Sequence, residues 1–220
     1  MGKQSVPVKP LRRAGLSQFS SLSMAGSTAH KDRSLAVFDR ILVPLDGSPS
    51  AEVALKVAEQ IPGRRIQVFG VEPDCTDLSE LCTGARDREA YLETVATALR
   101  DQGRRVTTLV ALGNPAEQIN ATAGAADLIV MSTHGRGAMG RVLFGSVADS
   151  VVRHAPAPTL IVRGEQWDAT ALQRIVALLD GSALAEQSLP LAVKLARAMK
   201  IPVHLIRVVD FDQVQASVLA

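Results

Sequence analysis

The feature that most constrains this fold is an alternation of short apolar runs and stretches of helical periodicity, which starts at Val37. Such an alternation is typical of successive βαβ units, in which helices connect parallel strands. Strands are expected at residues 37–45, 66–71, 106–111, 128–131 and 159–162. The run at residues 128–131 is fully apolar, as expected for a strand at the centre of a parallel sheet.

Helix signals occupy the gaps between these strands. Ser48 and Asn114 each precede a proline and can cap a helix that starts there. After a polar connection over residues 72–86, another helix should end at Gly103, and a fourth is expected at residues 146–154. With right-handed crossovers, five strands and four helices predict an α/β fold with a doubly wound, five-stranded parallel sheet. Its ligand site should lie beyond the carboxyl ends of the central strands.

The sequence then restarts, because residues 174–192 align without a gap on residues 40–58, with ten of nineteen positions identical. The copy continues through an apolar run at residues 203–209 and so contains only β-α-β. A two-stranded piece is too small to be stable alone. We expect it to dock on the first domain, to be poorly ordered, or to be the start of a truncated domain, and in each case not to bind a ligand alone.

These patterns divide the chain into four parts. The predicted parts are a disordered basic tail (1–36), a first domain (37–164), a linker (165–173) and the partial repeat (174–220).

The charge distribution argues against a nucleic-acid partner. Of the net charge of +2, the tail contributes about +5, which leaves the remainder near −3, and aromatic residues are only 3% of the chain. The first 31 residues contain no acidic residue, which fits a disordered tail, a misassigned start before Met24, or a transit peptide.

The remaining composition excludes other classes of site. No apolar run approaches the roughly 18 residues of a membrane helix, and no secretory signal is visible, so we expect no membrane association and a cytoplasmic location. Cys75 and Cys82 have no partners at zinc spacing, which predicts ordinary thiols and no metal site.

The segment MSTHGRGAMGRVLFGSV, residues 131–147, places a glycine-containing loop between the expected fourth strand and the last helix. Glycines let the backbone approach a ligand closely, and a helix start presents free amides to an anion. Taken alone, such a loop is as often an ordinary turn. Its position after a central strand favours a phosphate site.

The same segment resembles the signature of the universal stress protein family: a glycine, two residues, a glycine, nine residues, then a glycine followed by Ser or Thr. Gly135, Gly145 and Ser146 match this signature, whereas Ser132 replaces its first glycine. Asp46 in VPLDGS and the run ADLIVMSTHGRG are also similar to the family. The resemblance covers about residues 39–163 and the partial second copy. It implies a fold like that of the adenine nucleotide alpha hydrolases.

The resemblance also implies ATP as the ligand and assigns roles to particular positions. It places Asp46 and the backbone of Val71 at the adenine, and Met131 and Ser132 near the ribose. The phosphates are implied to contact Gly135, Gly145, Ser146 and Val147. An Asp-Gly-Ser sequence after a strand is also a good turn signal without any ligand, so the residues alone leave the role of Asp46 open.

We therefore predict an ATP-binding protein with a stress-response or regulatory role, with one nucleotide per chain. The chain lacks a P-loop, a Ser-Gly-Gly phosphate loop and an ordered Ser-His-Asp set, so no dedicated enzyme is expected, although slow ATP hydrolysis fits this pattern. The alternative is a family member that binds no nucleotide and acts through dimerisation or partner contacts. Residues 159–162 should form an edge strand, which predicts a homodimer paired there.

Overall fold

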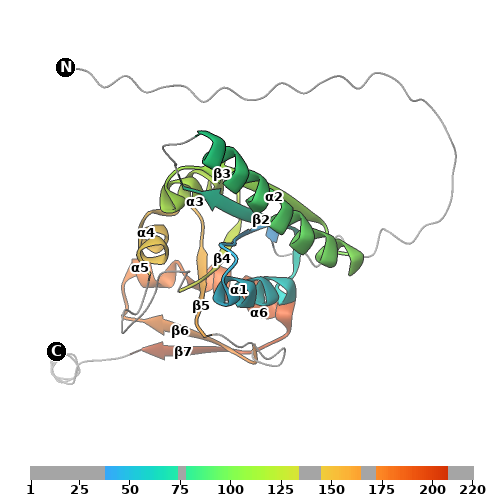
Figure 1. The fold of residues 1–220 in the computed structure, drawn as a ribbon. Coiled ribbons are helices and arrows are strands. Elements are labelled where there is room, and N and C mark those ends of the chain that lie inside the picture. The colour runs from blue at the N-terminus through green and yellow to red at the C-terminus, as the bar shows by residue number, and fades with distance from the viewer. Residues whose placement is uncertain (1–37, 74–77, 134–144, 165–171, 208–220) are drawn as a thin grey trace, which may run out of the picture. The chain divides into compact units, whose positions relative to one another are not determined.

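The computed structural model describes residues 38–73, 78–133, 145–164 and 172–207, all within the compact unit Arg33–Ala220. The first copy contains β1 (Phe38–Pro44), α1 (Pro49–Gln60), β2 (Gly63–Glu72), α2 (Leu78–Asp101), β3 (Val106–Leu112), α3 (Pro115–Ala123), β4 (Leu128–Ser132), α4 (Ser146–His154) and β5 (Thr159–Val162). The second contains β6 (Ile175–Leu179), α5 (Ala183–Glu186), α6 (Leu189–Met199) and β7 (Val203–Arg207). Figure 1 labels these elements.

Strands β1 to β5 form one parallel sheet in the order β3-β2-β1-β4-β5. The chain winds from β1 toward one edge through β2 and β3, then returns to place β4 on the other side of β1. The predicted doubly wound sheet is therefore confirmed, with β1 and β4 at the point where the winding direction reverses.

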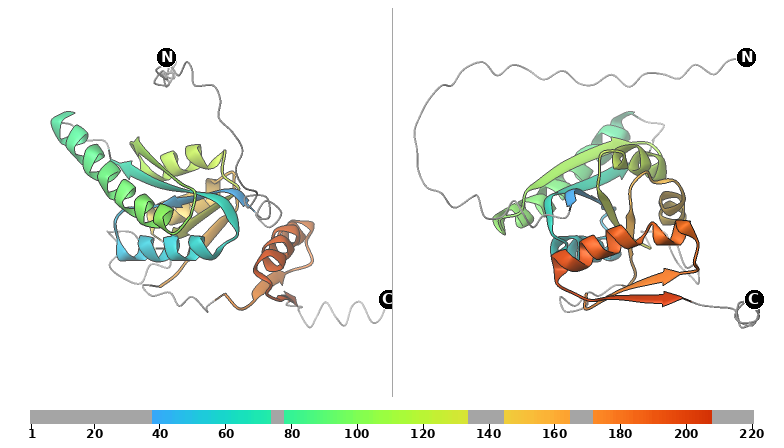
Figure 2. Two further views of the ribbon diagram at one scale, coloured as in Figure 1. Left: turned by 90° about the vertical axis from the view of Figure 1, so that its right-hand side faces the viewer. Right: turned by 180° about the vertical axis from the view of Figure 1, so that it is seen from behind.

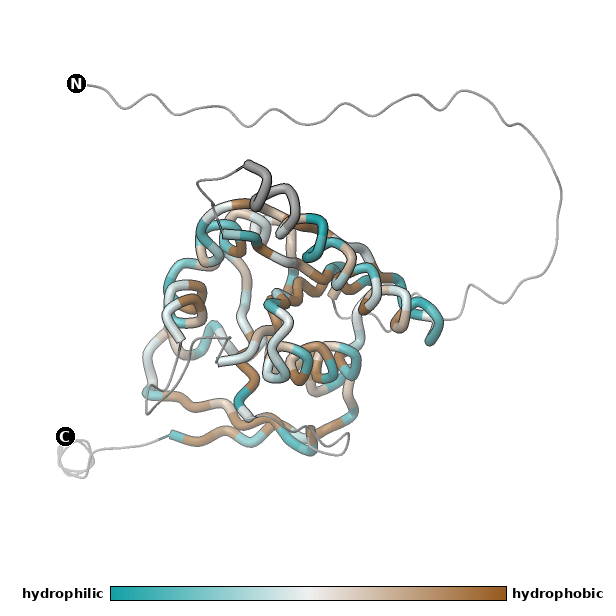
Figure 3. Tube along the Cα trace, viewed as in Figure 1, coloured by the Kyte–Doolittle hydropathy of each residue, from teal (hydrophilic) through white to brown (hydrophobic). Residues whose placement is uncertain are grey.

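Alternate residues of the strands build a core on each face of the sheet. In β1, Ile41 and Val43 belong to the cluster under α1 and α2, whereas Leu42 belongs to the cluster under α3 and α4. These three side chains are fully buried, and each such burial contributes about 1.5–3 kcal/mol. Figure 2 shows the sheet between its helices, and Figure 3 shows apolar residues concentrated along the strands.

Two predicted caps are present. The Ser48 hydroxyl accepts a hydrogen bond from the Ala51 amide at 3.2 Å, and the Asn114 side chain accepts bonds from the first amides of α3. These caps start α1 and α3 at the prolines that the sequence indicated.

Helix α2 begins at Leu78, so the prediction of a polar connection up to residue 86 is wrong at its C-terminal part. The polar residues Arg86, Asp87 and Glu89 are exposed on this helix, where they form its solvent face. The predicted end is confirmed, because Gly103 follows α2 with φ of +81°.

The second copy forms a separate two-stranded parallel sheet of β6 and β7. Ser182 caps α5 as Ser48 caps α1, but the single helix of the first copy is here split into α5 and α6. Pro190 stands near the start of α6, at the position of Lys56 in the first copy. Proline lacks an N–H and collides with the carbonyl four residues earlier, so it ends α5 and starts a new helix.

Two leucines of α6, Leu191 and Leu195, pack against the core cluster under α1 and α2, and the Lys194 ammonium lies 5.4 Å from the centre of the Phe38 ring. Other apolar side chains of the second copy are exposed, including Leu178 at 71% and Leu184 at 76%. The copy thus uses part of the first core while leaving much of its own apolar surface uncovered. The predicted domain limits stay predictions.

Candidate functional site

The reversal of winding between β1 and β4 brings most of the predicted site residues to one edge of the sheet. Asp46 follows β1, Met131 and Ser132 end β4, and α4 begins at Ser146. Val71 lies near the carboxyl end of β2, the other neighbour of β1. Parallel sheets of this type bind ligands at such a crevice. Gly135, also predicted to be part of the site, lies outside the described residues.

Asp46 forms a turn in this structure. Its Oδ1 accepts a hydrogen bond from the Ser48 amide at 2.9 Å, and Gly47 between them has φ of +79°. In the second copy, Asp180 accepts the same bond from the Ser182 amide at 2.8 Å, and Gly181 has φ of +88°. The turn therefore depends only on the shared Asp-Gly-Ser sequence. Its presence does not show whether a copy binds a ligand.

Tyr91 of α2 lies close to Asp46, which the sequence did not reveal. Burial, followed by the negative charges of Glu52 and Asp46, raises the pKa of Tyr91 to about 12. Its helical spacing indicated only a structural or surface position, because a helix period shows which face is buried but not which loop faces it.

The end of β4 presents its backbone to the crevice. Met131 is 5% exposed and packs in the core cluster under α3 and α4, so its side chain belongs to the core. Ser132 is half-buried and pairs with Val162 of β5. Among described non-glycine residues, Lys200 alone has a positive φ, so Ser132 has a backbone that serine adopts without strain in place of the signature glycine.

Thr133, immediately after β4, connects the end of that strand to the start of α4 through backbone hydrogen bonds. The buried Thr133 donates its N–H to the Val162 carbonyl at 3.0 Å, and its own carbonyl accepts the Gly145 N–H at 2.7 Å. A Cβ at Gly145 would lie 3.1 Å from that carbonyl oxygen. Gly145 has φ of −67°, so the close approach to Thr133, and not an unusual φ, disfavours a larger residue here.

The start of α4 has no side-chain cap, in contrast to α1 and α3. Gly145 occupies the N-cap position, Ser146 is exposed, and Val147 is half-buried. The first amides of a helix have no partner within the helix, and they lie at the positive end of its dipole. An anion can therefore bind at this helix start through backbone N–H groups.

Asp149 places a negative charge in the first turn of α4, but it pairs with Arg153 at 3.0 Å. The hydrogen bond from Arg153 lowers the pKa of Asp149, so the carboxylate stays charged at neutral pH. Its charge is thus partly offset by an arginine one turn further along the helix.

The second copy differs at the strand beside its aspartate. In the second copy, Arg207 pairs with Leu179. In the first copy, the register that pairs Pro44 with Phe69 places Gly70 beside Leu45 at the corresponding position. The Arg207 guanidinium nitrogen lies 2.7 Å from the place where Gly181 would carry a Cβ. An arginine side chain therefore covers the turn that contains Asp180.

Two further classes of site are absent from the described ranges. No group of three or more His, Cys, Asp or Glu residues there is arranged to hold a metal ion. Among the described helices, none combines the length and apolar character that a membrane crossing requires.

The family model described as the universal stress protein family matches residues 38–163. The chain belongs to the universal stress protein family. A universal stress protein of Thermus aquaticus is 36% identical over 138 residues, which span 58% of this chain and all of that protein. One from Mycobacterium tuberculosis is 30% identical over 132 residues and 56% of this chain. The chain spans only 45% of the length of that mycobacterial relative.

Solved structures agree with the fold. A universal stress protein of Archaeoglobus fulgidus matches with a TM-score of 0.66 and 20% identity, over 82% of this chain and 71% of that protein. Two other solved family members hold an adenine nucleotide, one in complex with cAMP and one from Arabidopsis thaliana with AMP bound.

The raised pKa of Tyr91 gives a test of the geometry around Asp46. Because the folded-state pKa of about 12 lies above the ordinary value of about 10, Tyr91 stabilises the fold below pH ~10, and this contribution is lost as the pH rises from ~10 through ~12. Tyr91 is the only tyrosine, so the ultraviolet absorbance of tyrosinate reports it alone.

We expect a native midpoint near 12 for this titration and a lower one in Asp46→Asn, which removes a neighbouring negative charge. The unfolded chain in denaturant is the control and should titrate near ~10. A native midpoint near that control value would contradict the described surroundings of Tyr91.

Proposed function

We propose that this chain binds ATP at the carboxyl ends of β1 and β4, with the phosphates at the start of α4. The first turn of α4 carries the proposal: it has no side-chain cap, and its amides, which have no partner within the helix, lie at the reversal point of the sheet. The hydrogen bond between Gly145 and Thr133 holds this helix start against the end of β4.

The proposed roles of the individual groups follow from their positions. The phosphates take the amides of Ser146 and Val147, and the ribose lies near the backbone of Ser132. The adenine lies between the Asp46 turn and the Val71 backbone, within the region where α2 supplies Tyr91. Gly135 is proposed to contact the phosphates because of the family resemblance alone.

ATP is supported over other anions by two considerations. The family resemblance implies it, and solved family members hold cAMP and AMP, which share its adenine and ribose. The aspartate turn beside the strand ends offers a carboxylate to the base, while the helix amides suit a phosphate.

We further propose that the chain acts by binding and not as a dedicated enzyme, in a regulatory or stress-response role in the cytoplasm. A family member that works without nucleotide is the alternative. Two features favour a nucleotide-binding member of the family over this alternative. Gly145 contacts Thr133, and the start of α4 has no side-chain cap.

Pairing of two chains through β5 is the second part of the proposal. Among the described strands, β5 has a neighbour on one side only. Pro158 and Val162 direct their carbonyls to β4, so Thr159 and Ile161 direct their backbone groups to the open edge, because successive residues of a strand alternate. A second copy of β5 can complete this edge and form a homodimer.

The phosphate pose is tested by Ser146→Pro. Proline suits the first position of a helix, and Gly145 before it already has the extended backbone that proline requires, with ψ of 157°. The variant thus keeps α4 but loses one N–H. Loss of a hydrogen bond to a charged group should weaken ATP binding by roughly tenfold or more in calorimetry.

Two variants serve as controls for this titration. Ser146→Ala keeps the amide and should weaken ATP less, whereas Ala183→Pro makes the same change at the first residue of α5 and should have no effect. An unchanged affinity in Ser146→Pro would show the phosphate pose to be wrong. Gly145→Val is less informative, because its side chain presses on Thr133 even without a ligand.

The dimer is tested by sedimentation of the wild type and of Thr159→Pro. Proline is tolerated at the first residue of a strand, and this one removes an N–H that faces the open edge. We expect a dimer that dissociates in the variant while ATP binding persists. Monomers alone at high wild-type concentration would rule the dimer out.

A further inference from the structure

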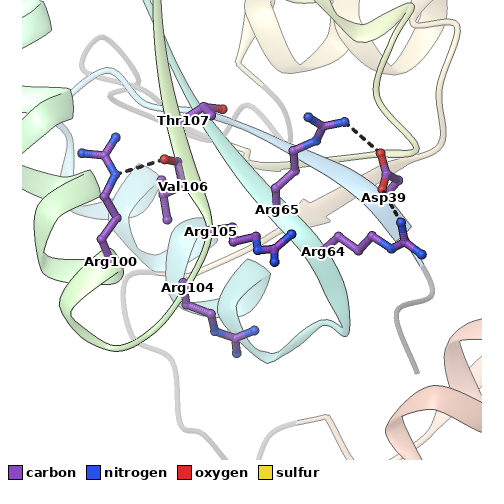
Figure 4. Close-up of a pocket in the computed structure, with 8 residues that line it drawn as sticks. All are labelled: Asp39, Arg64, Arg65, Arg100, Arg104, Arg105, Val106 and Thr107. Atoms are coloured by element: carbon purple, nitrogen blue, oxygen red, sulfur yellow. Dashed lines mark hydrogen bonds and ion pairs between the residues drawn. The ribbon is translucent and has the colours of Figure 1, made fainter. Parts of the chain in front are cut away.

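A groove of about 540 Å³ lies at the end of the sheet opposite the nucleotide site, where β2 and β3 begin. Figure 4 shows the five arginines that line it: Arg64, Arg65, Arg100, Arg104 and Arg105. We call it the arginine groove. Among the described residues that line it, Asp39 near the start of β1 is the one acidic side chain.

The parallel register assembles this groove from two arginine pairs that are distant in sequence. Arg64 and Arg65 are in β2 immediately before Ile66, Arg104 and Arg105 come immediately before Val106, and Ile66 is paired with Val106. The two pairs therefore lie side by side at the same edge. Sequence analysis missed this basic surface because the pairs are about forty residues apart.

The carboxylates around the groove do not neutralise it. Asp39 is shared by Arg64 at 3.6 Å and Arg65 at 2.9 Å. Arg100 pairs with Glu93 at 2.8 Å and also donates to the Val106 carbonyl.

The remaining two arginines have weaker compensation. Arg104 donates to the neutral backbone carbonyl of Glu59, and Arg105 has no ion pair within the part of the chain that the structure describes. Counting Asp39, Glu93 and the nearby Glu59 against the five arginines leaves a formal excess of two positive charges.

The lining selects the class of ligand. A volume of 540 Å³ suits a small molecule. Among the described residues, no aromatic side chain lines the groove, so none of them stacks there on a nucleic-acid base. Arginine guanidinium groups match phosphate oxygens in paired hydrogen bonds, and an excess of two positive charges suits two linked phosphate groups.

We propose that the arginine groove binds a diphosphate group, either free or carried by a nucleotide. This site is separate from the start of α4, because the amino and carboxyl ends of parallel strands lie at opposite edges of the sheet. It therefore does not depend on the proposed ATP site.

The test is a calorimetric titration of inorganic pyrophosphate into the full chain and its variants. The double variant Arg64→Gln/Arg105→Gln removes two charges while Asp39 keeps Arg65 as its partner. We expect its affinity to fall by about tenfold or more, since each lost hydrogen bond joins two charged groups. Arg197→Gln, at an exposed arginine of α6, is the matched control and should bind like the wild type.

The variant Ser146→Pro distinguishes this site from the proposed ATP site. Because Ser146 does not line the arginine groove, the variant should still bind pyrophosphate. Absence of saturable binding, equal losses in the double variant and Arg197→Gln, or loss in Ser146→Pro alone would each overturn the proposal. A parallel titration of Ser146→Pro with ADP distinguishes the source: tighter binding of ADP than of pyrophosphate indicates a nucleotide-borne diphosphate, and weaker binding a free one.

Discussion

The site depends on the pairing of two parallel strands, β1 and β4, whose connections leave the sheet in opposite directions. β1 leads through α1 to β2 on one side, while β4 leads through α4 to β5 on the other. Helices that diverge in this way leave a crevice at the carboxyl ends of the two strands. The buried aliphatic residues of both strands keep this pair at the centre of the sheet.

Within that crevice, the contact of Gly145 with Thr133 decides where α4 starts. The Thr133 carbonyl, immediately after β4, accepts the Gly145 amide, so α4 starts beside the carboxyl end of that strand. Glycine is favoured because a Cβ would lie only 3.1 Å from the carbonyl oxygen. This signature glycine thus has a packing role, beside the ligand role that we propose for it.

Much of this architecture was predictable because it depends on local signals. The five strands, the Ser48 and Asn114 caps and the end of α2 at Gly103 follow from hydrophobic pattern and capping residues. The N-terminal part of α2 was not predictable, since its polar face has the composition of a loop. The position of Tyr91 beside Asp46 and the assembly of the arginine groove depend on register between distant segments, which a single sequence does not display.

The repeat shows how little of a binding site is contained in its local motif. Asp46 and Asp180 form equivalent turns with closely similar hydrogen bonds. The first copy adds β4 and α4 beside its turn, whereas in the second Arg207 covers the turn and the strand pair has no further neighbour among the described strands. We therefore propose that the first copy alone binds the nucleotide.

Calorimetric titration of ATP into the wild type, Asp46→Asn and Asp180→Asn tests this assignment most directly. Asparagine keeps an oxygen that can accept the Ser48 or Ser182 amide, so each turn is preserved while its charge is removed. We expect one ATP per chain, weaker binding in Asp46→Asn and unchanged binding in Asp180→Asn. Two equivalent sites, or equal losses from the two substitutions, would contradict it.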